Sequence, residues 1–223
     1  MKLILTFIII LSSLFSIENK LILTQAEQNF IKNNPKITLG IDATWEPYIF
    51  VKDGKIIGGY DYDILKKINA LANTNIELVP GVWNDVVEDA KDAKLYGLAT
   101  SVYSKERAVH FEFTKPILII RNNMVVQEGN PQNIHSLEDL KGKVIGIQKD
   151  NGFQMNRVKN IQDVKIVEFQ NYEKLPFFLK NNKIDAIPMS DASIYTLHAI
   201  ETSLSTVLYL EDDSQTEIVC SIN

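Results

Sequence analysis

The chain has 223 residues, of which 45% are hydrophobic and 23% are charged, which is the composition of an ordinary globular protein. This length suits one large domain or two small lobes. The formal net charge of -5, without a cluster of basic residues, argues against a protein that binds nucleic acid. A single cysteine, Cys220, excludes an internal disulfide and the paired cysteines of a zinc site.

Residues 1–16 have the pattern of a secretory signal peptide. Lys2 precedes the apolar run 3–11, and small serine residues follow that run. The apolar run is too short to span a membrane comfortably. We therefore predict that this segment directs the chain out of the cytoplasm. An uncleaved membrane anchor stays open, because cleavage after Ser16 would place Leu14 at a position that prefers a small residue.

A short helix is predicted within residues 24–34. Thr24 and Glu27 have the three-residue spacing of a capping box, in which each side chain accepts a hydrogen bond from the other residue's backbone. Pro35 disfavours helical geometry in the residue before it and so ends the helix. This segment resembles the entry to the periplasmic sensor domains of bacterial signalling receptors, although a packing helix at any domain edge has the same pattern.

Residues 37–72 carry the most informative pattern of the chain. The apolar residues Ile37, Leu39 and Ile41 predict a buried strand. Asp53 and Gly54 predict the turn of a short hairpin. Apolar residues from position 64 onward fall on one face of a helix, which Asp61 or Asp63 can cap. Strand, aromatic loop, hairpin and capped helix in this order resemble the opening of bacterial solute-binding protein family 3, the polar amino-acid binding class.

That resemblance implies an α/β fold with two lobes, the type II periplasmic-binding-protein fold. Two crossing strands connect the lobes, which close on a ligand like a Venus flytrap. We expect lobe 1 to span residues 37–121, with residues 213–223 returning to it, and lobe 2 to span residues 122–212. Members of the family continue beyond the point where this sequence stops, so the chain looks C-terminally truncated.

Residues 100–117 resemble the family segment that carries a ligand-binding arginine, and Arg107 falls on that arginine. A guanidinium group offers a planar pair of donors and a permanent charge, which match a carboxylate. The resemblance implies that Arg107 holds a ligand carboxylate. It also implies that Thr100 donates through its hydroxyl or backbone. Val102 departs from the family, which often has a small polar residue there; its backbone N–H can still donate, but the site is more apolar. The alternative is that residues 105–107 are a solvated surface charge run.

Aromatic residues of the first lobe are candidates for packing against the ligand. Trp45 falls at the family's ligand-stacking aromatic, and Asp42 at a position that can reach the ligand side chain. A Trp ring attracts an ammonium group or covers an apolar substituent. Tyr60 is a further candidate, whereas we expect Tyr48 to pack under the loop and Trp83 to report little of ligand binding. The alternative for Trp45 is that it covers the first strand.

Residues 136–147 closely resemble the start of the family's second lobe, where a short helix precedes a strand. The family then places a turn at a helix N-terminus, whose backbone amides assist anion binding. Asn151 and Gly152 can still present such amides here. Asp150, however, brings a negative charge to a position where an anion site would have none.

The second lobe of the family also carries an acid that holds the α-amino group of the ligand. This acid normally follows five positions after the aspartate that Asp185 matches, but Ser190 occupies that position here. Asp191 follows directly. We expect Asp191 either to contact the ligand's amino group or to cap a helix over residues 192–200.

The resemblance implies periplasmic binding of a small polar ligand, an amino acid or related carboxylate, by closure of the lobes. The expected partner is an ABC permease for uptake, or a fused or partner membrane signalling module for sensing. The runner-up function is an enzyme on the same scaffold, similar to cyclohexadienyl dehydratase or to the regulatory domain of a lytic transglycosylase. No acid pair suits general acid–base catalysis, so we expect no catalytic residues, no metal and no cofactor.

Overall fold

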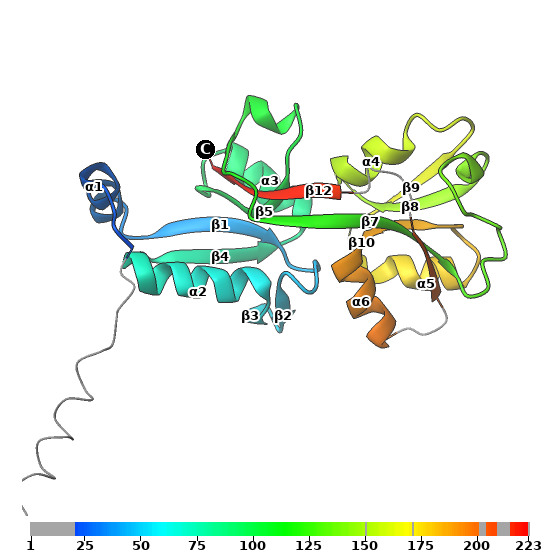
Figure 1. Cartoon of the computed structure of the whole chain (residues 1–223), viewed down its shortest axis with the longest axis horizontal. Helices are drawn as coiled ribbons and strands as arrows, with labels where there is room; N and C mark the ends of the chain where they lie inside the picture. Colours follow the sequence, from blue (N-terminus) through cyan, green and yellow to red (C-terminus); the bar gives the residue numbers. More distant parts are fainter. Residues whose placement is uncertain (1–20, 150, 171, 201–203, 209–214, 223) are drawn as a thin grey trace, which may run out of the picture.

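The computed structural model of the chain describes residues 21–149, 151–170, 172–200, 204–208 and 215–222. The predicted signal peptide at residues 1–16 lies outside the described residues, as do residues 213, 214 and 223 of the predicted return to lobe 1. Two groups of strands and helices stand side by side, joined by two strands that run between them (Figure 1). Within the described residues, no helix has both the length and the apolar character needed to cross a membrane.

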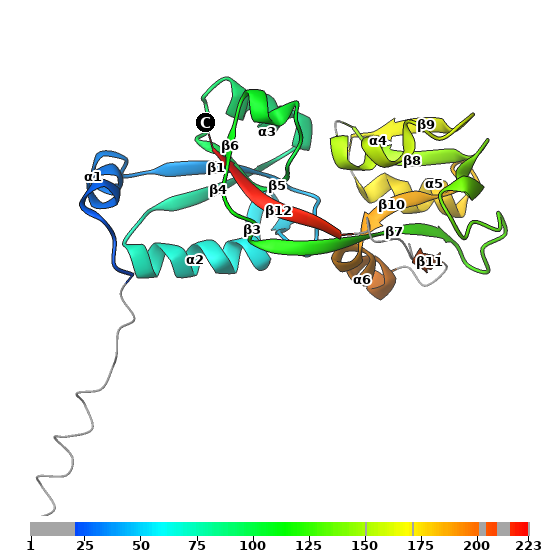
Figure 2. The same cartoon turned by 45° about the horizontal axis from the view of Figure 1, so that its top comes forward.

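The N-terminal helix α1 (Gln25–Asn33) begins with the predicted capping box. The Glu27 backbone N–H donates to Thr24 Oγ1 at 3.3 Å, and the Thr24 N–H donates to the Glu27 carboxylate at 2.6 Å. The helix has no buried residues and stands at the outer end of the first lobe (Figure 2). The Tyr96 hydroxyl donates to Asn34 Oδ1 at 2.7 Å and so connects the end of this helix to the lobe.

The first lobe is a twisted sheet with helices on both faces. Its strand order is β12-β5-β1-β4, in which β1, β4 and β5 are parallel and β12 is antiparallel to β5. Apolar residues of β1 pack with Leu65 of helix α2 on one face, and Leu98 of β5 packs with helix α3 on the other. The carboxyl ends of the parallel strands point toward the second lobe (Figure 1). The elements of this lobe are β1 (Ile37–Asp42), β2 (Phe50–Lys52), β3 (Lys55–Gly58), α2 (Tyr60–Ala72), β4 (Ile76–Gly81), α3 (Trp83–Lys91), β5 (Gly97–Val102), η1 (Arg107–Val109), β6 (Glu112–Phe113) and β12 (Gln215–Ile222).

The predicted hairpin is present, but the predicted cap of α2 is wrong. Strands β2 and β3 pair antiparallel across Asp53 and Gly54, which both have positive φ. Helix α2 begins after Gly59, which has φ 123° and forms no side-chain cap. The Asp61 carboxylate instead turns into the lobe and accepts a hydrogen bond from the Thr100 hydroxyl. A long-range partner therefore replaces the local cap.

Strand β7 (Leu118–Gln127) crosses from the first lobe to the second, at the expected boundary between residues 121 and 122. Its first four residues pair with β12 of the first lobe. From Asn122 onward it pairs with β10 of the second lobe, and from Asn123 also with β11. Because the pairing partner changes between Arg121 and Asn122, we propose this peptide as the boundary between the lobes.

The second lobe repeats the arrangement of a sheet between helices. Strands β8 and β9 are parallel, and Ile145 of β8 forms a bridge with Ala186, just before β10. One core contains Val158 of α4, and the other contains Leu179 of α5 and Leu197 of α6. The elements are η2 (Glu138–Leu140), β8 (Val144–Gln148), α4 (Gly152–Val158), β9 (Lys165–Phe169), η3 (Tyr172–Lys174), α5 (Leu175–Lys180), β10 (Ile187–Ser190), α6 (Asp191–Ile200) and β11 (Leu204–Leu208).

Candidate ligand site between the lobes

A small inner cavity lies where the strand ends of the first lobe face the second lobe. Its volume is about 20 Å³. Ligands of α/β proteins bind at the carboxyl edge of parallel strands, and this cavity is at that edge. The residues around it are Asp42, Trp45, Trp83, Ser101, Val102 and Arg107 from the first lobe, and Gln148 and Asn151 from the second.

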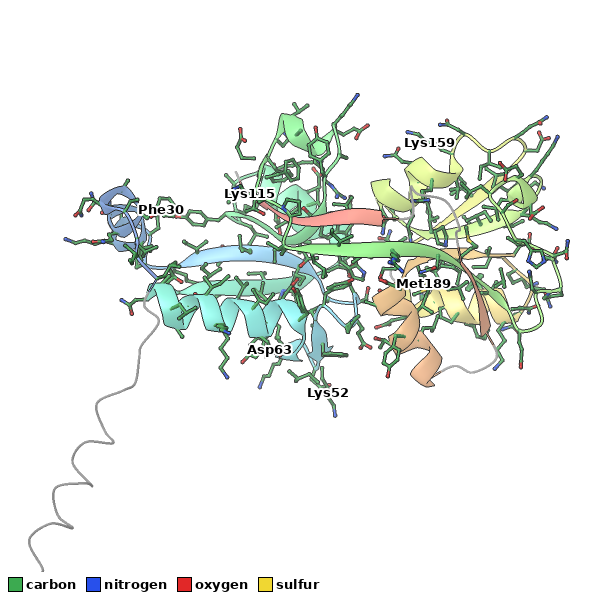
Figure 3. The ribbon with its side chains drawn as sticks, in the orientation of Figure 1. Phe30, Lys52, Asp63, Lys115, Lys159 and Met189 are labelled. Atoms are coloured by element: carbon green, nitrogen blue, oxygen red, sulfur yellow. The ribbon has the colours of Figure 1, made fainter. Side chains whose placement is uncertain are left out.

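A larger chamber of about 450 Å³ adjoins the inner cavity on the side of α3 and α4. Arg107 and Asn151 line both spaces, so they stand at the junction between them. Charged residues of both lobes, among them Lys91 and Lys159, surround the chamber. Lys159 lies at the end of α4 in Figure 3. The inner cavity by itself has room for about one water molecule.

Arg107 is held at this junction by contacts with its own lobe. It begins the short helix η1, and its backbone N–H donates to Ser104 Oγ at 3.1 Å. Nη1 donates to the Val102 carbonyl oxygen at 2.9 Å. Cζ lies 5.1 Å from the centre of the Trp83 ring, which is the geometry of a cation–π interaction. These contacts orient the guanidinium before any ligand arrives.

Asp42 is a buried carboxylate whose described partners are all neutral donors. Oδ1 accepts from the Thr44 backbone N–H and hydroxyl, both at 2.9 Å. Oδ2 accepts from Nε2 of Gln148, so this hydrogen bond spans the two lobes. Burial raises the pKa of Asp42, and it outweighs the opposite effect of the hydrogen bonds from Gln148 and Thr44. A cationic ligand group would compensate the burial of this charge.

The second lobe holds Gln148 in place through the buried side chain of Gln154. Gln154 Oε1 accepts from the Gln148 backbone N–H at 2.9 Å, and Nε2 donates to the Pro188 carbonyl oxygen. Asn151 is the N-cap of α4, and its Oδ1 accepts from the Gln154 N–H at 3.1 Å. Gln154 thus links β8, α4 and β10 at the edge of the cleft.

The structure brings five of the nine predicted site residues to the inner cavity: Asp42, Trp45, Val102, Arg107 and Asn151. The rings of Trp45 and Tyr48 are in contact, with their centres 4.8 Å apart and their planes inclined by 56°. Tyr48 is 2% exposed, so it packs under the loop as predicted.

The other four predicted residues do not line the inner cavity. The Thr100 hydroxyl is buried and bonded to Asp61. Tyr60 is exposed at the start of α2, and Gly152 is the first residue of α4. Asp191 is exposed at the start of α6, where Oδ1 accepts from the Ala192 N–H at 2.9 Å. The helix begins at Asp191 itself, and the Ser190 hydroxyl takes the cap position, because it accepts from the Ser193 N–H at 3.2 Å. Asp191 also accepts from the Arg121 N–H of β7 at 3.4 Å, so the predicted cap by Asp191 is not formed.

Three residues around the cavity were not among the predicted site residues. Trp83 lies directly beside Arg107 at the inner cavity, although we expected it to report little of ligand binding. Ser101 is near the end of β5, and Gln148 is the last residue of β8. Each of the three lies at or just after the carboxyl end of a parallel strand, where ligands of α/β proteins bind. This position relative to the predicted strands was the sequence signal that could have identified them as site residues.

Solved structures share this fold. Arginine-bound ArgBP from T. maritima, in its Gly52Ala form, matches with a TM-score of 0.77 and 20% identity, covering 87% of this chain and 91% of that chain. An ancestral arginine-binding protein bound to arginine matches with a TM-score of 0.75 and 24% identity, covering 85% and 84%. These likenesses confirm the predicted two-lobed type II periplasmic-binding-protein fold.

Curated relatives match over most of this chain. A probable histidine-binding protein of Campylobacter jejuni is 29% identical over 168 residues, which are 74% of this chain and 64% of the relative. The L-cystine-binding protein TcyJ of Escherichia coli is 22% identical over 160 residues, 71% and 60% of the respective lengths. The chain therefore spans less than two thirds of the length of these relatives.

The family model for bacterial extracellular solute-binding proteins, family 3, matches residues 37–184. The match covers both sides of the inner cavity, from Asp42 and Arg107 to Gln148 and Asn151. The chain belongs to the bacterial extracellular solute-binding proteins of family 3.

Proposed function

We propose that the chain binds an amino acid or a related carboxylate between its lobes, as the periplasmic binding step of ABC-type uptake. The observation that carries this proposal is the Arg107 guanidinium, which Trp83 and the Val102 carbonyl hold at the mouth of the inner cavity. The names of the relatives, which describe histidine and cystine binding, support the ligand class.

The residues around the inner cavity suit the two ends of an amino acid. Arg107 offers a pair of parallel donors to a carboxylate. Asp42 is a buried carboxylate that lines the same cavity, and it can accept from an ammonium group. Trp45 and Trp83 present aromatic faces that attract a cation and cover apolar atoms.

Ligand contacts to both lobes would favour the closed arrangement. Arg107 and Asp42 belong to the first lobe, whereas Gln148 and Asn151 belong to the second. A ligand shifts an equilibrium between open and closed forms only by its difference in affinity for the two. The ligand we propose gains its second set of contacts only on closure. An ABC permease would recognise the closed form, and a membrane signalling module is the alternative partner.

The proposal is tested by isothermal titration calorimetry with a panel of amino acids and organic acids. We expect at least one α-amino acid to bind the wild-type chain. Arg107→Ala should then lose roughly 2–5 kcal/mol of binding free energy, as for other buried charge pairs. This corresponds to an affinity roughly 30- to 5,000-fold weaker.

Two further variants test whether the loss of affinity is specific to the guanidinium group of Arg107. Arg107→Lys should recover little, because an ammonium group cannot reproduce the planar pair of donors. Asp191→Asn is the control, since Asp191 is exposed and does not line the inner cavity, and it should bind within threefold of wild type. Binding by Arg107→Ala within threefold of wild type would refute the proposed role of this residue.

A further inference from the structure

A second cavity of about 240 Å³ lies between the lobes, and Trp45 lines both this cavity and the inner one. Its first-lobe wall comes from the loop after β1 and from β2, and its second-lobe wall comes from η3, α5, β10 and α6. Met189 of β10 lies on the side of the second lobe that faces the first (Figure 3). The apolar side chains around the cavity are Trp45, Val51, Pro176, Met189 and Leu197.

Two carboxylates from different lobes also line this cavity, Glu46 and Glu173. Partial burial, and in second place the charge of Glu173, raise the pKa of Glu46. The charge of Glu173 also contributes to the raised pKa of Asp42. The two lobes therefore carry like charges that approach each other as the cleft closes.

Within the part of the chain that the structure describes, no lysine or arginine forms a salt bridge with Glu46 or Glu173. The salt bridges found there join lysines to Glu77, Glu88, Asp89 and Asp92. Repulsion between Glu46 and Glu173 opposes closure, and a cation placed between them would reverse the sign of that interaction.

We propose that this second cavity binds a small organic cation with an apolar body, such as an arylamidinium or alkylammonium ion. The positive group would lie between Glu46 and Glu173, and the body would pack on Trp45, Met189 and Leu197. A Trp face attracts cations, and the apolar side chains exclude water from the body of the ligand. The volume is below the roughly 300 Å³ of the smallest drug-sized sites, which suits a molecule with one ring or a short chain.

Such a cation would contact both lobes and so stabilise their closed arrangement. Because coupling between two ligands is reciprocal, the cation and the ligand of the inner cavity would each tighten the binding of the other. Trp45 lines both cavities, so a ligand in either one would contact the same side chain.

The test uses calorimetry with benzamidinium as the probe and neutral benzamide as its isostere. The titration is run on the whole chain, alone and with a saturating amino acid from the panel above. We expect saturable binding of benzamidinium, with benzamide at least tenfold weaker. The cation should bind more tightly, not less, when the inner cavity is occupied.

Matched variants locate the probe. Glu173→Gln should weaken benzamidinium at least threefold, and the pair Glu46→Gln with Glu173→Gln at least tenfold. Glu168→Gln is the control. It removes one negative charge from the second lobe, as Glu173→Gln does, but Glu168 lines the larger chamber beside α3 and α4. Equal binding of benzamidinium and benzamide would overturn the proposal, as would an unaffected double variant, or strict competition with the amino acid. Binding of benzamidinium by itself does not depend on the amino-acid proposal, so the two fail separately.

Discussion

At the level of single residues, the Trp83 ring and the Arg107 guanidinium form a contact at the inner cavity that orients the guanidinium. Trp83 is 5% exposed and packs with the core beside α3, so its ring position is determined by the interior of the lobe. Arg107 rests against that ring. The residue that holds the ligand carboxylate in our proposal is thus positioned by a core residue.

This contact predicts that Trp83 reports ligand binding by its fluorescence. A variant with Trp45→Phe retains Trp83 as its one tryptophan. Its emission should change when an amino acid binds, because a carboxylate paired with the guanidinium beside the ring changes the charge near it. The complementary Trp83→Phe variant should keep the signal of Trp45. Ligand titrations followed by emission spectra measure both. An unchanged spectrum of the Trp45→Phe variant at full occupancy would contradict the placement of Trp83.

Asp61 predicts a pH dependence of stability. Burial raises the pKa of its carboxyl to about 7, above the usual value near 3.8. The folded chain therefore binds this proton more tightly than the unfolded chain. Below about pH 4 the Asp61 carboxyl is protonated in both the folded and the unfolded chain, so it does not make stability depend on pH there. As the pH rises from about 4 to about 7, the folded state becomes progressively less stable relative to the unfolded state.

Asp61→Asn removes this titration while keeping an oxygen that can accept from the Thr100 hydroxyl. Between pH 5 and pH 8 the wild-type chain should lose at least about 1 kcal/mol more free energy of unfolding than the variant, since one pKa unit corresponds to about 1.4 kcal/mol. Urea denaturation at several pH values measures the difference. Parallel profiles for the two proteins would show that Asp61 does not titrate in this range.

At the level of elements, the start of α2 depends on one glycine. A Cβ at Gly59 would lie 2.5 Å from the Tyr48 carbonyl oxygen and 2.6 Å from Cα of Ile49, and the residue has φ +123°. The helix therefore approaches the loop that carries Trp45 more closely than any side chain allows. The Tyr60 and Asp61 N–H groups donate to the carbonyl oxygens of Pro47 and Tyr48 across this contact.

Gly59→Ala should destabilise the chain by more than about 2 kcal/mol, because backbone atoms must move and the φ angle is strained. Gly54→Ala is the matched control: it also has positive φ, at +71°, but nothing lies within 4 Å of its added Cβ. It should cost only about 1–2 kcal/mol, the strain of a left-handed residue. Chemical denaturation compares them, and equal losses would show that the close contact has no energetic effect.

At the level of the whole molecule, the hydrogen bond from Gln148 to Asp42 joins the lobes at the inner cavity. Strand β7 joins them at the other side, where its pairing changes between Arg121 and Asn122. Rotation about such a crossing is the usual form of hinge closure. The Gln148 amide therefore contributes to the closed arrangement through a contact that opening must break.

Gln148→Met removes this interlobe hydrogen bond and leaves the Asp42 carboxylate without its amide donor. We expect the equilibrium to shift toward open forms and the radius of gyration from small-angle X-ray scattering to increase. Gln127→Met is the control, since the Gln127 amide donates to the Lys180 carbonyl within the second lobe. A radius of gyration that is equal in the two variants would contradict the role of this contact in closure.

Local sequence signals determined the order of elements. The capping box of Thr24 and Glu27 and the turn at Asp53 and Gly54 each involve neighbours a few residues apart, and both are present in the structure. The alternation of strands and helices likewise follows from periodicity along the chain. The resemblance to family 3 then placed Arg107 and Asp42 at the cleft, where the structure has them.

Tertiary structure decided which side chains face the ligand. Asp61 has the position of a helix cap, but the Thr100 hydroxyl, 39 residues away, takes its carboxylate. Trp83 has the pattern of a core residue, and only the approach of Arg107 brings it to the cavity. Gln148 faces Asp42 across 106 residues of sequence. The periodicity of apolar residues indicates which face of a helix or strand is buried. The residue that each side chain contacts on that face depends on how elements distant in the sequence pack together. These contacts therefore could not be predicted from the local sequence pattern.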